Sequence, residues 1–235
     1  MYDMNNTYKD FEDNICEIAI LPVGAIEQHG PHLPLSVDHL QAERISKSVA
    51  EKMGAYLLPG IPFGNSETHI GFKGSVTISS NTLKLLVIDI LQSLIDQGFK
   101  YVGVLNMHGG NLILKTAVRE INLSNNDGIT VLCNPFLEIN EIAKLCLDNY
   151  GHEIHAGEFE TSVMMHLDPE NVRDCPVDWI PDVDPGYFDL EPMKNFCPDG
   201  VWGKASLASI KKGEKLFKAM TDATVEKLSK IFHQF

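Results

Sequence analysis

The stretch EIAILPVG, from Glu17 to Gly24, is almost continuously apolar and ends on a glycine. This pattern is typical of a strand that is buried on both faces of a parallel sheet. The residues that follow, AIEQHGPHLPLSVDHL at positions 25–40, are polar and rich in histidine. Apolar residues then recur at helical spacing at positions 42, 45, 49 and 53, and we expect Asp38 to be the N-cap of that helix.

Strands and helices alternate along the rest of the chain. The apolar patterns predict further strands at residues 55–61, 101–105 and 129–133, and helices at residues 81–97, 112–123, 138–150 and 157–167. A last helix is predicted over residues 205–233, with an interruption allowed at Gly213. The alternation favours an α/β domain with a mostly parallel sheet and helices on both of its faces. A length of 235 residues suits a single domain that spans residues 1–235.

Two long segments contain no predicted element. Residues 64–80 are rich in Gly, Ser and Asn, and a loop of that length suggests a functional role. Residues 168–198 are rich in Pro and Asp and are predicted to be a surface excursion. We expect this excursion to contact another subunit or to cover a pocket.

The composition, 44% hydrophobic and 22% charged, is that of an ordinary globular protein. Nineteen basic against 32 acidic residues give a net charge of −13, which disfavours binding to nucleic acid or to an anionic membrane surface. The five cysteines form no zinc-binding or redox motif, and the first residues lack the pattern of a signal peptide. We therefore expect a cytoplasmic protein with reduced thiols and neither a membrane nor a nucleic-acid partner.

Histidines and carboxylates follow two of the predicted strands directly. In open parallel sheets, ligands bind beyond the carboxyl ends of the strands. The first strand is followed by Glu27, His29, His32, Asp38 and His39, and the third is followed by His108 within NMHGGN. A single loop histidine is usually only hydrogen-bonded, but several at one sheet edge are harder to explain in that way. Imidazole and carboxylate ligands without cysteine favour a catalytic Zn or Mn site over a structural zinc site.

A third segment adds further candidates. HAGEFETSVMMH begins with His155, and Glu160 follows within a helical pattern. Gly109 and Gly110 remove side-chain bulk beside His108, which allows backbone or substrate to approach closely.

Four segments together resemble the creatininase (creatinine amidohydrolase) family. They are LPVGAIEQHGPHLPLSVD, NMHGGN, HAGEFETS and GVWG, and they occur in the family's order between about Leu21 and Gly213. The resemblance implies a three-layer α/β/α sandwich that binds two divalent metal ions, usually Zn or Mn, with Fe also compatible with the ligands. It also implies a homo-oligomer, most commonly a hexamer.

The resemblance assigns a role to each residue of the site. Glu27, Asp38 and His108 would hold one ion, and His29, Asp38 and Glu160 would hold the other, so that Asp38 bridges the two. Three carboxylates and one hydroxide would balance the charge of two divalent ions. His155 matches the catalytic histidine and would pass a proton to the leaving nitrogen. A metal lowers the pKa of bound water from ~15.7 to about 7, and this implies hydrolysis of a C–N amide-type bond by a metal-bound hydroxide.

The sequence also departs from the creatininase pattern. Gly110 stands where creatininases carry a glutamate, and the two tryptophans, Trp179 and Trp202, both lie after the HAG segment. In these features the chain looks more like the wider family, which includes formamide-cleaving deformylases and a peptide-trimming enzyme. The leading hypothesis is an amidohydrolase acting on a small-molecule amide, either a cyclic amide such as creatinine or a formamide.

Two alternatives remain open at this stage. The first alternative is a family peptidase that trims a short peptide. The second is a metal-binding assembly protein without turnover. The presence of all five ligands and of His155 favours an enzyme. His69, Gly109 and Gly110 are candidates for substrate binding, whereas His32 and His39 are expected to support the ligands or to face solvent.

Overall fold

Four parallel strands form the central sheet in the order β2-β1-β3-β4. The computed structural model describes residues 1–235, and the strands are β1 (Ile18–Val23), β2 (Tyr56–Leu57), β3 (Tyr101–Asn106) and β4 (Ile129–Cys133). β2 is shorter than the predicted strand 55–61, because after Leu58 donates to the carbonyl of Ile20 the N–H of Gly60 turns to the side chain of Glu43 instead of to β1. Pairing resumes only at Ile61, which forms an isolated bridge with Val23.

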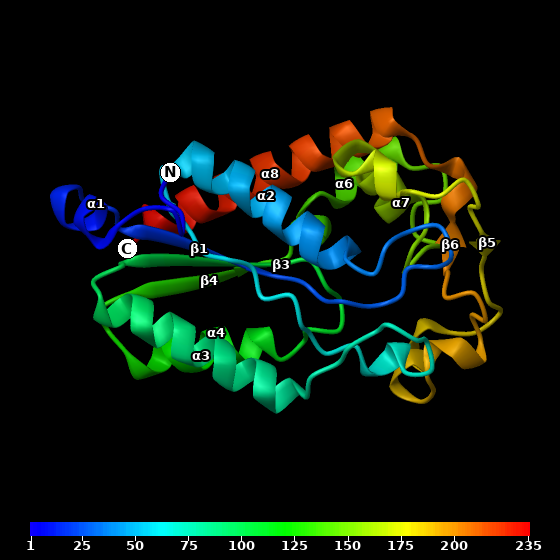
Figure 1. Ribbon diagram of the computed structural model, residues 1–235, viewed down its shortest axis with the longest axis horizontal. Helices are drawn as coiled ribbons and strands as arrows, with labels where there is room; N and C mark the ends of the chain where they lie inside the picture. The colour runs from blue at the N-terminus through cyan, green and yellow to red at the C-terminus, as the bar shows by residue number, and fades with distance from the viewer.

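Helices cover both faces of the sheet (Figure 1). One face carries α2 (Val37–Met53), α5 (Pro135–Glu138), α6 (Asn140–Cys146), α7 (Glu158–Leu167) and α8 (Ile210–Phe232), and the other carries α3 (Ser80–Asp96) and α4 (Leu114–Ser124). The short helix α1 (Tyr8–Asp13) lies near the amino-terminal end of the strands. The predicted three-layer α/β/α sandwich with a parallel sheet is confirmed. None of these helices combines the length and the hydropathy that crossing a bilayer requires.

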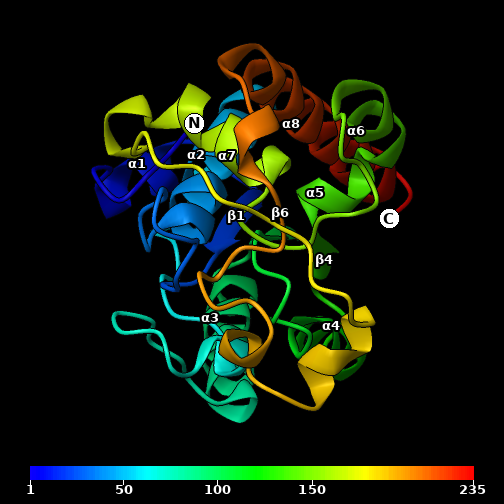
Figure 2. The ribbon, with the colours of Figure 1, turned by 90° about the vertical axis from the view of Figure 1, so that its right-hand side faces the viewer.

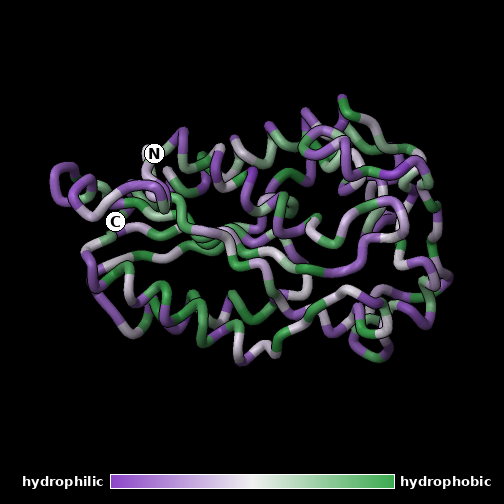
Figure 3. Tube along the Cα trace, viewed as in Figure 1, coloured by the Kyte–Doolittle hydropathy of each residue, from purple (hydrophilic) through white to green (hydrophobic).

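The sheet separates two hydrophobic clusters. Successive side chains of a strand point to opposite faces, so Ile20 packs in the cluster under α2 and α8, while Leu21 packs in the cluster under α3 and α4. Both residues are at most 1% exposed. Figure 3 shows apolar residues concentrated along the strands. Burial on both faces explains the continuous apolar run of β1.

Three predicted helices have boundaries that differ from the sequence-based expectation. Helix α2 begins at Val37 with Ser36 at the N-cap, so the prediction of Asp38 as the N-cap was wrong by two residues. Asp38 lies instead in the first helical turn, and its side chain is buried. Helix α8 begins at Ile210, because the Ser209 side chain accepts a hydrogen bond from the backbone N–H of Lys212 and caps it there. The helix predicted over 138–150 is shorter than expected, because only α6 (Asn140–Cys146) lies within that range and α5 ends where it begins.

The excursion 168–198 crosses the carboxyl end of the sheet, the end that faces the viewer in Figure 2. It contains short 3-10 turns and one strand, β5 (Asp178–Trp179), which pairs antiparallel with β6 (Gly203–Lys204). The segment therefore lies over the edge of the sheet where the sequence places its histidines.

Helix α8 continues through Gly213 without interruption. A Cβ atom at this position would lie 1.9 Å from the carbonyl oxygen of Ser162 in α7. Glycine is therefore required because the two helices approach closely, and it does not mark a break in α8.

We predict that Gly213→Ala destabilises the protein. Alanine in a helix interior favours folding by about 1 kcal/mol over glycine, but the clash with backbone should outweigh this gain and leave a net loss of roughly 1–2 kcal/mol. Urea denaturation measures the free energy of unfolding. Glu214→Ala, at the exposed neighbouring position, is the control and should have little effect. A more stable Gly213→Ala variant would contradict the packing argument.

Candidate metal centre

The five predicted ligands meet at the carboxyl end of the sheet. Glu27 and His29 follow β1, Asp38 lies in the first turn of α2, His108 follows β3, and Glu160 lies in the first turn of α7. The first four residues are at most 4% exposed, and the side chain of Glu160 is 20% exposed. Segments that are up to 133 positions apart in the chain thus converge on one buried site.

Gly24 allows the end of β1 to approach the start of α2. A Cβ atom at Gly24 would lie 2.5 Å from the Cα of His39 and 2.7 Å from the carbonyl carbon of Asp38. Only glycine fits between these two segments without displacing backbone. The contact holds the loop with Glu27 and His29 against the helix that carries Asp38.

The carboxylate of Asp38 faces two groups of donor atoms. Its Oδ2 lies 3.0 Å from Nδ1 of His108, which is also 3.3 Å from Oε1 of Glu27. Its Oδ1 lies 3.2 Å from Nε2 of His29, which is 3.7 Å from Oε1 of Glu160. In each group of three residues, the donor atoms lie within 4.8 Å of one another, a separation that one metal ion can span.

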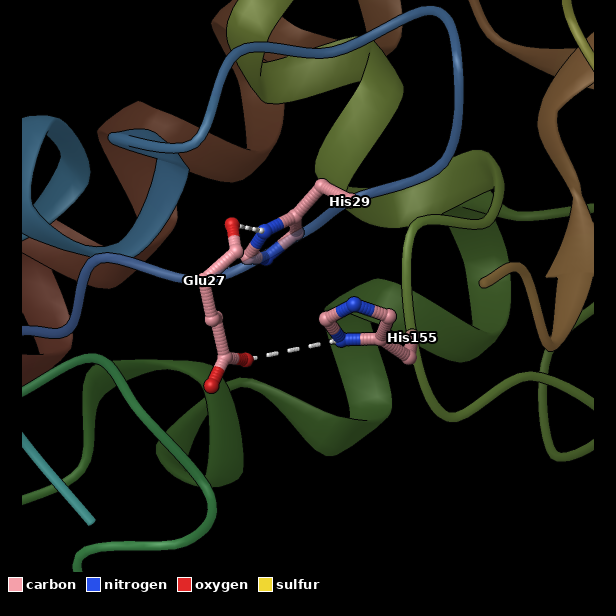
Figure 4. A group of neighbouring side chains, drawn as sticks. All are labelled: Glu27, His29 and His155. Atoms are coloured by element: carbon pink, nitrogen blue, oxygen red, sulfur yellow. Dashed lines mark hydrogen bonds and ion pairs between the residues drawn. The ribbon is translucent and has the colours of Figure 1, made fainter. Parts of the chain in front are cut away.

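Backbone groups orient side chains in both groups of metal-binding residues. Nδ1 of His29 donates to the carbonyl of Glu27 at 3.1 Å, and Nε2 of His108 donates to the carbonyl of Asn65 at 2.7 Å (Figure 4 shows the first). The opposite nitrogen of each ring is thereby directed at the carboxylates, as is usual for metal-binding histidines. Glu160 is held in a similar way, because its Oε2 accepts a hydrogen bond from the backbone N–H of Ala156.

Ala156 has the only positive φ angle, 52°, of any non-glycine residue. Such a conformation is uncommon for a residue with a Cβ atom and often occurs at functional sites. It turns the chain between His155 and α7, so that the N–H of Ala156 reaches Glu160.

Several polar atoms of the site are buried without a hydrogen-bond partner. They include Oε2 of Glu27, Nε2 of His29 and Oδ2 of Asp38. Leaving such an atom unsatisfied costs about 1–3 kcal/mol, and metal ions bound by the two groups of donors would satisfy all three. The donor set contains nitrogen and oxygen but no sulfur, which suits Zn or Mn. The residues therefore fit a pair of divalent ions.

The charges in the site keep its carboxylates ionised. Burial alone would raise the pKa of Glu27, but the positive charge of His108 lowers this pKa to about 2. The pKa of Asp38 is likewise lowered, against the effect of burial, by His29 and His108. Although burial lowers the pKa of a histidine, Asp38 and Glu160 together raise that of His29 well above its usual value. A metal ion would therefore displace protons from these rings on binding.

His155 faces the same site from the segment before α7. Its backbone pairs with Trp202 in an antiparallel bridge, and its side chain is 8% exposed. Nε2 lies 2.7 Å from the carbonyl of Gln28, and Nδ1 lies 3.9 Å from Oε1 of Glu27 (Figure 4). Burial and the charge of His29 lower the pKa of His155 and favour its neutral form. Glu27, His29 and His155 also form a third group with metal-binding spacing, so the geometry is compatible with either proton transfer or ligation by His155.

Two further side chains belong to the site. His69, predicted as a substrate-binding residue, is 4% exposed, and its Nε2 lies 3.3 Å from Oε1 of Glu27. Gln28 was not predicted, yet its Nε2 lies 2.9 Å from Nδ1 of His69 and 3.1 Å from Nε2 of His155. Its only sequence signal was its position between two ligand candidates. Gln28 therefore contacts both histidine rings: its side-chain amide donates to Nδ1 of His69, and its backbone carbonyl accepts from Nε2 of His155.

The other candidate residues have distinct environments. Gly109 and Gly110 both line the cavity beside the site, and a Cβ atom at Gly110 would lie 2.3 Å from the carbonyl of Asn65. This backbone therefore excludes any side chain at position 110. His32 is fully buried and bonds to Thr161, whereas the side chain of His39 is 24% exposed. Neither belongs to a group with metal-binding spacing.

A cavity of about 530 Å³ opens beside the metal centre. Glu27, Asp38, His108 and Glu160 form part of its wall, and Phe188 and Asp189 from the excursion 168–198 contribute another part. The excursion thus helps to line the pocket, one of the two roles predicted for it.

The creatininase family, described as creatinine amidohydrolase, matches residues 4–228. The chain belongs to the creatininase family. Its relatives include creatinine amidohydrolase of Pseudomonas putida, 30% identical over 96% of this chain and 95% of the relative. Mycofactocin precursor peptide peptidase of Mycobacterium ulcerans is 29% identical over 90% of this chain and 84% of the relative.

Solved creatininase structures have the same fold as this creatininase-family chain. A crystal structure of creatinine amidohydrolase superimposes with a TM-score of 0.86 and 28% identity, covering 98% of this chain and 97% of that one. Other similar structures are a creatininase mutant described as Zn-Zn type and a creatininase described as the Mn form. These comparisons confirm that the chain is a creatininase-family hydrolase that acts on amide-type bonds, and they support divalent metal binding.

The lowered pKa of His32 makes the stability of the protein depend on pH. Burial, reinforced by the charge of His29, lowers the pKa of His32 to about 4. In the unfolded chain, the pKa of His32 is about 6.5. At pH values between about 4 and about 6.5, the unfolded chain therefore binds a proton at His32 that the folded chain does not. The contribution of His32 therefore makes the protein less stable as the pH falls through this window, by at most about 1.4 kcal/mol per pH unit.

We expect His32→Gln to flatten this dependence. Urea denaturation in the presence of EDTA, at several pH values between 4.5 and 7.5, compares the variant with the unmodified protein. His39→Gln, at the more exposed neighbouring histidine, is the control and should leave the slope unchanged. An unaltered slope for His32→Gln would mean that His32 is not held neutral by the fold.

Proposed function

We propose that this chain is a binuclear metal-dependent amidohydrolase that cleaves a C–N amide-type bond of a small molecule, either a cyclic amide such as creatinine or a formamide. The observation that carries the proposal is the buried carboxylate of Asp38, which presents one oxygen to His29 and the other to His108. A single ion would need only one of these groups.

The proposed ligands fall into two sets that share Asp38. Glu27, Asp38 and His108 would hold one ion, and His29, Asp38 and Glu160 would hold the other. When bound, the ions would lower the pKa of water from ~15.7 to about 7 and polarise the carbonyl group of the substrate. The similarity to creatininases described as Zn-Zn and Mn forms supports Zn or Mn, and Fe suits the same ligands.

His155 is the proposed proton carrier. Its Nε2–H donates to the carbonyl of Gln28, so the lone pair at Nδ1 faces Glu27 and the site. Because burial lowers its pKa, the ring is neutral and able to accept a proton at Nδ1. From there the proton would pass to the leaving nitrogen of the amide. His69, Gly109 and Gly110 are the proposed contacts to the substrate.

A peptide substrate is the second candidate. The chain is 29% identical to a mycofactocin precursor peptide peptidase, and the backbone at Gly110 excludes the glutamate that creatininases carry at this position. The remaining alternative, metal binding without turnover, is less well supported because the ligands and His155 are assembled around one cavity.

The organisation of the protein beyond the site is also proposed. The family match over residues 4–228 supports a single catalytic domain over 1–235. A homo-hexamer and a cytoplasmic location remain predictions from the family resemblance and the composition.

We predict that two divalent ions bind per chain and that Asp38→Ala loses both, because each ion requires one oxygen of that carboxylate. Elemental analysis of zinc-loaded protein after gel filtration measures the metal content. Glu43→Ala removes an exposed carboxylate from the same helix and should retain two ions. A full complement in Asp38→Ala would contradict the bridging role.

We predict that His155→Ala retains both ions and lowers turnover by about 10²–10⁴-fold, the usual contribution of a general acid or base. Glu160→Ala should lose metal as well as activity. Metal content and turnover are measured in parallel, with creatinine, formamidopyrimidines and short peptides as substrates. If His155→Ala emptied a metal site while Glu160→Ala left both filled, the two roles would be exchanged.

A further inference from the structure

The cavity beside the metal centre is larger than a single small ring requires. Its volume, about 530 Å³, lies within the range of roughly 300–1,000 Å³ that is typical of pockets for drug-sized ligands. The metal centre occupies only one part of the wall. The rest of the cavity must therefore accommodate some other part of the substrate.

One continuous apolar surface forms the wall beneath α5, α6 and the start of α7. It consists of Met107, Phe136, Ala143, Leu147 and Phe159. Met107, Ala143 and Leu147 are at most 8% exposed and belong to the core cluster under α2 and α8. Phe136 and Phe159 pack against that cluster. All five therefore line the same cavity and contact the same core cluster. Leu112 and Ile154, 80% and 44% exposed, extend the apolar surface to the mouth of the cavity.

The cavity wall contains no lysine or arginine. The carboxylates of Glu27, Asp38 and Glu160 would be balanced by bound metal, which leaves Glu153 and Asp189 as the acidic groups of the remaining wall. Burial raises the pKa of Glu153 to about 7, but neither its neutral nor its ionised form attracts an anion. An anionic group in this part of the cavity would lose its hydration beside two carboxyl groups and would meet neutral donors such as Asn140 and Tyr150 but no cationic side chain.

We infer that the substrate carries a bulky apolar group next to its scissile amide, that this group lies against Met107, Phe136 and Leu147, and that it bears no negative charge. The inference rests on the proposed hydrolytic function, because it takes the metal centre as the position of the amide. A phenyl ring has the size and chemistry that this surface fits. Phosphorylated or carboxylated substrates of the same size would find no cationic side chain on this wall and are disfavoured by its two carboxyl groups.

Three matched probes test the size and the charge of this group separately. N-formyl-phenylalaninamide carries the ring, N-formyl-glycinamide lacks it, and N-formyl-4-sulfophenylalaninamide adds a sulfonate, a poor metal ligand, to the ring. Calorimetry with the zinc-loaded protein measures the Kd of each probe. We expect the phenylalanine probe to bind at least about tenfold more tightly than either of the others, since burying a phenyl ring provides at least that factor.

Two variants with matched controls locate the binding surface. Ala143→Phe fills the apolar face from α6 and should weaken binding of the phenylalanine probe at least about tenfold, while Leu145→Phe, 89% exposed on the same helix, should not. Phe136→Ala removes part of the same face without adding bulk and should also weaken this probe, with little effect on the glycine probe. If Ala143→Phe fails to fold, Phe136→Ala and the three probes with the unmodified protein still decide the question.

The outcomes separate this inference from the proposed function. Equal affinities for the phenylalanine and glycine probes, tighter binding of the sulfonated probe, or no measurable binding of the phenylalanine probe would overturn the inference. Formate release without dependence on the ring would retain the hydrolase and also reject the apolar subsite. Ring-dependent binding without formate release would support the subsite and count against formamides as substrates.

Discussion

The sharing of one buried carboxylate between two sets of donors is the constraint on which the site depends. Asp38 is 2% exposed, and its two oxygens face histidines that come from different strand ends. A buried charge of this kind is stable only beside compensating positive charge. Its place in the first turn of α2 adds the favourable field of the helix N-terminus. The parallel sheet, Gly24 and the start of α2 are the features that bring these groups together.

The directions of the donor atoms are determined by the protein itself. His29 and His108 each bind a backbone carbonyl through the ring nitrogen that faces away from the carboxylates. Glu160 is held by the N–H of Ala156, which requires the unusual positive φ angle at that residue. Such preorganisation lowers the cost of ordering the site when a metal binds. Gln28 extends the same principle to His69 and His155.

The cavity combines two surfaces of opposite character. The polar metal centre lies at the carboxyl edge of the sheet, whereas the apolar wall is an uncovered part of the core under α2 and α8. In the proposed reaction, the polar surface would hold the reacting amide and the apolar surface would hold the neighbouring group of the substrate. The parts of α5, α6 and the excursion 168–198 that line the cavity carry none of the proposed metal ligands.

The sequence by itself determined the class of fold and the identity of the candidate ligands. The apolar run of β1 predicts a strand buried on both faces, and histidines that follow two parallel strands must meet at one edge, because parallel strands end on the same side. The resemblance to creatininases added Glu160 and His155, whose position in space no local pattern reveals.

Only the tertiary structure decided how these residues are used. The position of Gln28 between two ligand candidates does not reveal its contacts, because these are to His69 and His155, 41 and 127 residues away. The roles of Gly110 and Gly213 follow from the backbones of Asn65 and Ser162, which no sequence pattern brings close to them. The apolar wall was likewise hidden, since helical periodicity marks a residue as buried but does not say whether another side chain or a cavity faces it. Such long-range packing exists only once the chain has folded.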